Sequence, residues 1–388
     1  MRLSQRLTQV PPYLFAQLDA RKAAVVARGV DVIPLGIGDP DLSTPEPIIA
    51  EMRQAVGDPS NHRYPDYKGS LSFRQAAARY MLRRFGVTVD PERELLGLIG
   101  AKEGLAHLVW ALVDPGDVTL CPDPGYPVYA VHTAFCGGFA YRMPLRAEHG
   151  FLPELSRIPT EIVERAKILF LNYPNNPTTA VADLEFFEEA VDFCRRYGIV
   201  LCHDNAYAEI TYDGYHAPSV LEVQGAKDVA IEFHSLSKPF NMTGWRIGFA
   251  CGNADAIEAL GTVKNNTDSG PFTAVQVAAE RALTQSEALV ASQVSVYRRR
   301  RDRMVEALRA AGIAVQPPRG TIYLWCPVPE GETSEGFAGR LLEEAGVFVT
   351  PGTGYGQEGE GFFRISLTCS DDRLEEAARR IAALGSGG

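Results

Sequence analysis

The segment Ser235-Leu236-Ser237-Lys238-Pro239-Phe240-Asn241-Met242-Thr243-Gly244-Trp245-Arg246 is the most informative part of the sequence. Lys238 lies just past the predicted strand 229–234, between small hydroxyl residues and eight positions before Arg246. A lysine becomes nucleophilic when burial and nearby cations lower its pKa, and it then forms an imine with a carbonyl. Ser235, Ser237 and Arg246 can donate hydrogen bonds to a phosphate. The segment favours an imine-forming lysine beside an anion site, although serine-flanked lysines are mostly surface residues.

Around this segment, short apolar runs alternate with amphipathic stretches. This alternation is typical of an α/β fold, in which helices flank a mostly parallel sheet. Apolar residues at helical spacing predict helices at 105–113 and 183–191, the second one stopped by Gly198. The predicted strands span residues 94–99, 118–121, 167–171, 199–203, 229–234 and 247–251.

The pattern changes near Ser286 and predicts a second, smaller α+β domain. A long helix ending near Gly312 is followed by an apolar segment at 313–327, a helix at 334–345, a strand at 362–368 and a terminal helix. We expect a helix at 12–28 and a strand at 32–36 to pack against this domain. The predicted organisation is an N-terminal arm and part of the small domain at 1–45, a large cofactor-binding domain at 46–285, and the C-terminal small domain at 286–388.

Composition narrows the classes of function. The 388 residues carry 38 Lys+Arg against 48 Asp+Glu, and a net charge of −10 argues against nucleic acid as a partner. No stretch of about 18 apolar residues is present, and no signal peptide precedes Pro11, so we expect no membrane association. The seven cysteines are scattered without C-x-x-C spacing, which favours reduced, mostly buried thiols and a cytoplasmic location.

Three patterns are interpreted as structural. The glycines at 354, 356 and 359 match a dinucleotide-binding motif, but they lead into a strand rather than a helix, so we expect a flexible loop there. The cluster formed by Arg298–Arg301 and Arg303 is expected to be a solvated helix face. His203 beside Asp204 has no second ligand at helical spacing, so no metal site is predicted.

Polar side chains follow several other predicted strands. Asp204 ends one strand, where open α/β sheets bind ligands, and a buried carboxylate there would keep a pyridine nitrogen protonated. Tyr207, three residues later, can reach the phenolic oxygen of such a ring. Asn176 follows a second strand as a neutral donor. Residues 100–104 join a strand to a helix and predict an anion site, while Tyr126 offers an aromatic face after the next strand.

Together these segments resemble the pyridoxal-phosphate-dependent class I/II aminotransferases of fold type I. The resemblance covers nearly the whole chain and includes residues 36–41, 64–69 and 363–366. It implies a large mostly parallel sheet domain, a smaller α+β domain, pyridoxal 5'-phosphate as cofactor, amino-acid and 2-oxo-acid substrates, and a homodimer with shared active sites.

The resemblance also implies roles for individual residues. Lys238 would hold the cofactor and move a proton, with Asp204 on the pyridine nitrogen and Asn176 and Tyr207 on the ring hydroxyl. The α-carboxylate of the substrate would bind to Arg364 beside Gly38, with Asn176 and Tyr13 as further substrate contacts. The ring would stack on Tyr126, and the phosphate would be held by Ala101, Lys102, Ser235, Ser237, Arg246 and the partner subunit's Tyr64.

Within this superfamily the chain is most similar to the LL-diaminopimelate aminotransferases. Two positions differ from the expected pattern: Thr179 replaces a common glycine, and Tyr67, beside Asp66, stands where plant-type enzymes carry a glutamate for the distal ammonium. Asn265 and Asn266 are further candidates for the distal end of the substrate. The alternatives are an aminotransferase for aspartate, alanine, methionine or aromatic amino acids, or a pyridoxal-phosphate-dependent C–S lyase.

Overall fold

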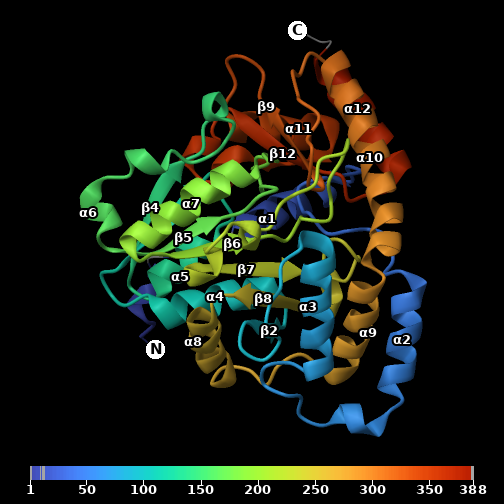
Figure 1. Ribbon diagram of the computed structural model, residues 1–388. Coiled ribbons are helices and arrows are strands. Elements are labelled where there is room, and N and C mark those ends of the chain that lie inside the picture. The colour runs from blue at the N-terminus through green and yellow to red at the C-terminus, as the bar shows by residue number, and fades with distance from the viewer. Residues whose placement is uncertain (1, 9, 11–13, 386–388) are drawn as a thin grey trace.

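A seven-stranded sheet forms the centre of the computed structural model, which describes residues 2–8, 10 and 14–385 (Figure 1). The strand at position two of the sheet, β8, runs antiparallel to both neighbours, and the other pairs are parallel. The sheet is therefore mostly parallel, as predicted. Its strands, in spatial order, are β2 (Leu95–Leu98), β8 (Gly248–Gly252), β7 (Ala230–Ser235), β6 (Val200–Asp204), β5 (Ala166–Leu171), β3 (Val118–Asp123) and β4 (Phe139–Pro144).

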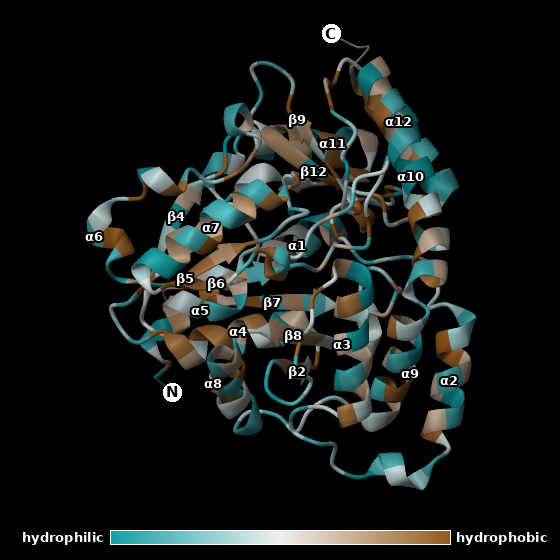
Figure 2. Ribbon diagram, viewed as in Figure 1, coloured by the Kyte–Doolittle hydropathy of each residue, from teal (hydrophilic) through white to brown (hydrophobic). Residues whose placement is uncertain are grey.

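Helices cover both faces of this sheet. Leu169 and Leu171 of β5 pack toward one face, whereas Ile168 and Phe170 pack toward the other, because side chains alternate along a strand. Figure 2 shows the resulting hydrophobic strands behind helices with one polar side. The first face holds α3 (Leu71–Phe85), α7 (Leu184–Tyr197) and α9 (Thr273–Thr284), and the second holds α4 (Ala101–Leu112), α5 (Val128–Phe135) and α8 (Ala254–Asn265).

Local sequence accounts for the ends of several elements. The Asp183 side chain accepts a hydrogen bond from the Phe186 amide at 3.0 Å, and Gly198 ends α7 at a φ of +67°. Strand β4 was not predicted, because it is an edge strand on which Phe139 is 55% exposed and only Met143 is buried. The short α6 (Thr160–Val163) connects β4 to β5.

The C-terminal part builds a second core with the N-terminal segment. Strand β1 (Ile33–Pro34) pairs with β10 (Val347–Phe348), and β9 (Tyr323–Pro327), β12 (Phe362–Ser366) and β11 (Thr350–Pro351) form an antiparallel sheet. Around them lie α1 (Leu14–Val26), α10 (Ser286–Ala310), α11 (Ser334–Ala345) and α12 (Asp371–Gly385), while α2 (Glu46–Val56) packs on α9. The domain boundaries at residues 45 and 285 stay a prediction.

The arginine cluster of α10 is only partly a solvated face, so that prediction is wrong for two residues. Arg300 and Arg301 are each 4% exposed. Arg300 forms ion pairs with Asp41 and Asp371, and Arg301 pairs with Asp213. These carboxylates come from distant parts of the chain and compensate the buried charges.

The glycine-rich segment does not open a helix. It forms two 3₁₀ turns, at Gly352–Tyr355 and Gln357–Gly359, and the Glu358 amide donates to Asp123 at 3.2 Å. At Gly356, which has a φ of +140°, a Cβ would lie 1.9 Å from Asp123 Oδ1. This glycine is therefore required for packing against Asp123.

Two sequence-level expectations about covalent and membrane features can be compared with the structure. All seven cysteines are free thiols, and each is buried apart from the partly exposed Cys136. Among the described helices, none combines the length and the apolar character needed to cross a membrane.

Candidate active site

A cavity of about 370 Å³ lies at the carboxyl ends of β5, β6 and β7. Parallel strands bring their carboxyl ends to one sheet edge, so side chains far apart in sequence converge there. The cavity is lined by twelve of the residues predicted for the site: Gly38, Ala101, Lys102, Tyr126, Asn176, Asp204, Tyr207, Ser235, Ser237, Lys238, Arg246 and Arg364.

Tyr64 and Tyr13 are the other two predicted residues. Tyr64, which follows the 3₁₀ turn Pro59–His62, is 87% exposed and does not line the cavity. Tyr13 lies outside the described residues. Within a single chain, the cavity therefore forms without Tyr64.

Lys238 lies deep in the cavity. Its Nζ donates a hydrogen bond to the Gly38 carbonyl at 2.6 Å, and burial lowers the pKa of the amine. Gly38 is held closely on its other side, since a Cβ there would lie 1.9 Å from the Tyr323 hydroxyl. A buried amine with a lowered pKa has the properties of a nucleophilic lysine.

Asp204 presents an incompletely satisfied carboxylate to the cavity. Tyr129 donates to its Oδ2 at 2.8 Å, whereas its Oδ1 has no hydrogen-bond partner among the described residues. Burial raises the pKa of Asp204 to about 6, which the hydrogen bond from Tyr129 partly opposes. A buried carboxylate with a spare oxygen fits the protonated ring nitrogen of pyridoxal phosphate.

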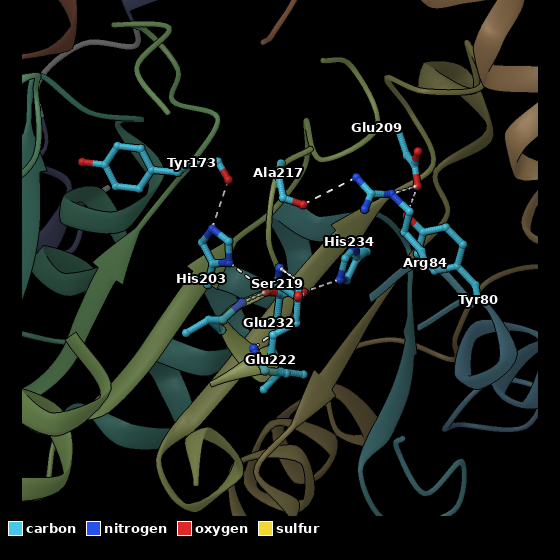
Figure 3. A network of polar contacts seen from close by, with 12 residues as sticks. Tyr80, Arg84, Tyr173, His203, Glu209, Ala217, Ser219, Glu222, Glu232 and His234 are labelled. Atoms are coloured by element: carbon cyan, nitrogen blue, oxygen red, sulfur yellow. Dashed lines mark hydrogen bonds and ion pairs between the residues drawn. The ribbon is translucent and has the colours of Figure 1, made fainter. Parts of the chain in front are cut away.

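A buried polar network joins β6, which ends at Asp204, to β7, which precedes Lys238 (Figure 3). Glu232 of β7 lies opposite His203 of β6 and accepts from His203 Nδ1 at 2.8 Å and from His234 Nε2 at 2.7 Å. Ser219 Oγ and the Val220 amide also donate to Glu232, at 2.8 and 2.9 Å. The ring nitrogens of His203 thus serve this network and the Tyr173 carbonyl.

Positive groups and amides gather where the N-terminus of α4 meets the cavity. Gly100 precedes α4 at a φ of +101°, and a Cβ there would lie 2.3 Å from an Arg246 nitrogen. Partial burial and the Arg246 charge lower the pKa of Lys102. Ser235 and Ser237 line the same region. A helix N-terminus with two cations and two hydroxyls fits a phosphate dianion.

Arg364 also lines the cavity. It is 1% exposed, and its Nη1 and Nη2 donate to Asn176 Oδ1 and the Gly36 carbonyl, each at 2.7 Å. Its guanidinium carbon lies 4.0 Å from the Tyr323 ring centroid and 4.9 Å from that of Tyr355. The Nε of Arg364 has no hydrogen-bond partner in the part of the chain that the structure describes. A fixed, buried guanidinium with free N–H groups suits a carboxylate.

Three residues of this region were missed by sequence reasoning. Tyr129 follows Tyr126 by nearly one helical turn, and this spacing could have pointed to it. Asn172 donates to the Asp204 carbonyl at 2.6 Å and accepts from the Asn176 amide at 2.8 Å. Tyr323 enters the cavity from β9, and no local pattern near it indicates this position.

Comparison with known proteins agrees with this geometry. The family model described as "Aminotransferase class I and II" matches residues 30–381. The LL-diaminopimelate aminotransferase of Moorella thermoacetica is 54% identical over 381 residues, which cover 98% of each chain. The enzyme of the same name from Desulforudis audaxviator is 55% identical over 378 residues, covering 97% of this chain and 96% of that one.

Among solved structures, the substrate-bound BacF structure from Bacillus subtilis has a TM-score of 0.95 and 37% identity, covering 99% of this chain and 98% of that one. The fold, the composition of the cavity and the extent of these matches lead to one conclusion. The chain belongs to the class I and II aminotransferases and is an enzyme that transfers amino groups with pyridoxal 5'-phosphate as its cofactor.

Proposed function

We propose that this enzyme transfers an amino group from LL-diaminopimelate to 2-oxoglutarate. The observation that carries the proposal is the identity above 50%, over nearly the full chain, to relatives named LL-diaminopimelate aminotransferase. The buried Arg364 supports it only in part, because a carboxylate clamp accepts the α-carboxylate of any amino acid.

The cavity supports a defined role for each residue around the cofactor. Lys238 binds the cofactor, Asp204 holds the proton on its ring nitrogen, and Asn176 and Tyr207 bind its ring oxygen. Tyr126 would stack on the ring, and Arg364 beside Gly38 would hold the substrate α-carboxylate, with Asn176 as a further contact. Tyr13, outside the described residues, is proposed as another substrate contact. The phosphate is held by Ala101, Lys102, Ser235, Ser237 and Arg246.

When bound, pyridoxal phosphate supplies an aldehyde and an electron-withdrawing ring. The protein contributes charge and position. Asp204, beside the ring nitrogen, keeps a proton there because its spare oxygen lies in a buried, weakly screened site. Lys238 Nζ would accept a proton from the substrate α-carbon, because burial favours the neutral form of this amine. Arg364 fixes the α-carbon by binding the adjacent carboxylate.

We further propose that the enzyme is a homodimer in which Tyr64 reaches the phosphate site of the neighbouring subunit. Tyr64 and Tyr67 are exposed by 87% and 53%, and Phe272 by 41%. Their loops lie side by side, because a Cβ at Gly270 would be 3.2 Å from the Asp66 carbonyl. An exposed aromatic surface of this kind is typical of an interface. Sedimentation should show a dimer, and an active monomer would contradict the shared site.

The same surface accounts for recognition of the distal end of the substrate. Burying a distal ammonium or carboxylate without partners costs several kcal/mol, so the site must supply them. Asp66, Tyr67, Asn265 and Asn266 do not line the cavity of their own chain. We propose that they act on the neighbouring subunit's substrate.

The proposed role of Tyr64 at the neighbour's phosphate site leads to a separate prediction. Tyr64→Phe should weaken cofactor binding by about 1 kcal/mol, as expected for one lost hydrogen bond.

Two further proposals concern the setting of the enzyme. Free, mostly buried cysteines support a cytoplasmic location, which fractionation of the native cells would test. Two buried clusters support domains at 46–285 and at 1–45 with 286–388, with Tyr207, Ile210 and Tyr212 of the first range packed into the second cluster. Limited proteolysis near residues 45 and 285 would support this division, and cutting within either part first would contradict it.

The substrate proposal is tested by comparing kcat/KM for LL-diaminopimelate with the values for aspartate, alanine, methionine and phenylalanine, all with 2-oxoglutarate. We expect LL-diaminopimelate to rank first, with Lys238→Ala as the inactive control. The proposal is wrong if any other amino acid exceeds it by more than about tenfold, or ~1.4 kcal/mol. Release of a thiol and ammonia from a sulfur amino acid without an acceptor would indicate a C–S lyase instead.

A further inference from the structure

Tyr323 contacts both Tyr207 and Arg364 in the cavity. Its hydroxyl lies 3.0 Å from the hydroxyl of Tyr207, and its ring lies beneath the Arg364 guanidinium at 4.0 Å. The side chain is 3% exposed and belongs to β9, where it pairs in register with Ser366 of β12. The hydroxyl cannot move freely, because it also faces Gly38 so closely that a Cβ on this glycine would lie 1.9 Å from it.

Hydrogen counting restricts how the two tyrosines can bond. Each phenol has a single O–H to donate, so only one of the pair donates to the other at any time. If Tyr207 donates to the ring oxygen of the cofactor, its own oxygen must accept from Tyr323. The Tyr207–Tyr323 contact is therefore compatible with cofactor binding in only one donor direction.

The surrounding charges support this direction. Burial alone would raise the pKa of Tyr323, but nearby positive charge, chiefly that of Arg364, outweighs burial and lowers it, whereas burial raises the pKa of Tyr207. A phenol beside a cation is a stronger hydrogen-bond donor than an ordinary phenol. Donation from Tyr323 polarises Tyr207 and makes Tyr207 a stronger donor in turn.

We propose that Tyr323 is a positioning residue for this aminotransferase, which donates to Tyr207 and thereby directs the Tyr207 O–H to the ring oxygen of the cofactor. The inference rests on the proposed contact between Tyr207 and that oxygen. A donor to the ring oxygen favours its anionic form and disfavours sharing a proton with the adjacent nitrogen. Removing the donor, or weakening it through Tyr323, therefore raises the pH at which the bound cofactor changes its visible absorbance.

The test is a pH titration of this absorbance in the loaded enzyme, without substrate. Tyr207→Phe should raise the midpoint by about one pH unit and Tyr323→Phe by about half a unit. The double variant should match Tyr207→Phe alone, because Tyr323 acts only through Tyr207. Tyr212→Phe, which loses a buried hydroxyl that donates to the Thr321 carbonyl at 2.7 Å, is the structural control and should leave the midpoint unchanged.

The role of Tyr323 and the contact between Tyr207 and the ring oxygen can fail separately. An unchanged midpoint in Tyr323→Phe, or a double variant whose shift equals the sum of the two single shifts, would overturn the role of Tyr323. If Tyr207→Phe itself leaves the midpoint unchanged, the contact between Tyr207 and the ring oxygen is wrong, and the inference fails with it. Melting temperatures of the cofactor-free variants show whether a shifted midpoint reflects a folding defect. Tyr212→Phe and Tyr323→Phe should lower the melting temperature by similar amounts.

Discussion

Replacing Arg364 by lysine should separate positive charge from hydrogen-bond geometry at the proposed carboxylate clamp. Arg364 is 1% exposed and donates to both Asn176 Oδ1 and the Gly36 carbonyl. A lysine offers a single nitrogen, so it can keep at most one of these bonds in place and cannot present a fork to the substrate. The Gly36 carbonyl also accepts from Thr350 Oγ1 at 2.7 Å, so the cost arises at Asn176 Oδ1, where loss of the donor should reduce the free energy of unfolding by about 1–3 kcal/mol.

The effect on catalysis follows from the same geometry. Losing one of two charge-assisted hydrogen bonds to the α-carboxylate costs about 1.5–3 kcal/mol, so kcat/KM should fall roughly 10- to 150-fold. The assay compares an amino acid with the corresponding amine that lacks the carboxylate, and only the amino acid should lose activity. An equal loss for both compounds would refute the role of Arg364. Arg301→Lys is the control, because Arg301 is also buried and also donates to two acceptors. It should lose stability but leave the ratio of the activities on the amino acid and the amine unchanged.

Three further predictions concern stability. Burial raises the pKa of Asp204 from 3.8 to about 6, so the cofactor-free enzyme loses stability relative to Asp204→Asn as the pH rises through this range, by up to about 3 kcal/mol above pH 6. Denaturant unfolding at pH 4 and pH 8 tests this, and a difference in the free energy of unfolding that does not grow between the two pH values would contradict it. Thr179 has a φ of +62°, a strained backbone for a residue with a Cβ, so Thr179→Gly should raise the free energy of unfolding by about 1 kcal/mol. A lower melting temperature of this variant would contradict the strain. Burial alone would raise the pKa of Glu232, but His203 and His234 hold it well below its ordinary 4.5. The contribution of the Glu232 carboxylate to the free energy of unfolding is therefore complete above pH 4.5 and is lost as the pH falls through the pKa of the folded protein. Glu232→Gln should therefore cost about 3 kcal/mol at neutral pH and less in acid, and a gap that is constant with pH would exclude this account.

Much of the cavity could be predicted because its residues follow strand ends. Asp204 is the last residue of β6 and Lys238 lies three residues after β7, and parallel pairing alone brings such positions to one edge of the sheet. Asp183 and Gly198 similarly mark the ends of α7 through local hydrogen bonding and a left-handed backbone.

The remainder depends on contacts between distant segments. Tyr323 reaches Tyr207 across 116 positions, and nothing in the sequence near either residue specifies that contact. The burial of Arg300 likewise depends on Asp41, 259 positions away. Periodicity showed which residues share a helix face, but it could not show that a charged face would be covered by carboxylates from other elements.

The assignment of Lys238 as the cofactor-binding lysine is the central claim, and chemical labelling tests it most directly. Reduction of the loaded enzyme with borohydride, followed by peptide mapping, should place the cofactor on the peptide that contains Lys238. Lys264 is fully buried in ion pairs with Glu103 and Asp268, and Lys227 pairs with Glu94, so neither should be labelled. A label on Lys264, Lys227 or Lys102 in place of Lys238 would contradict the account.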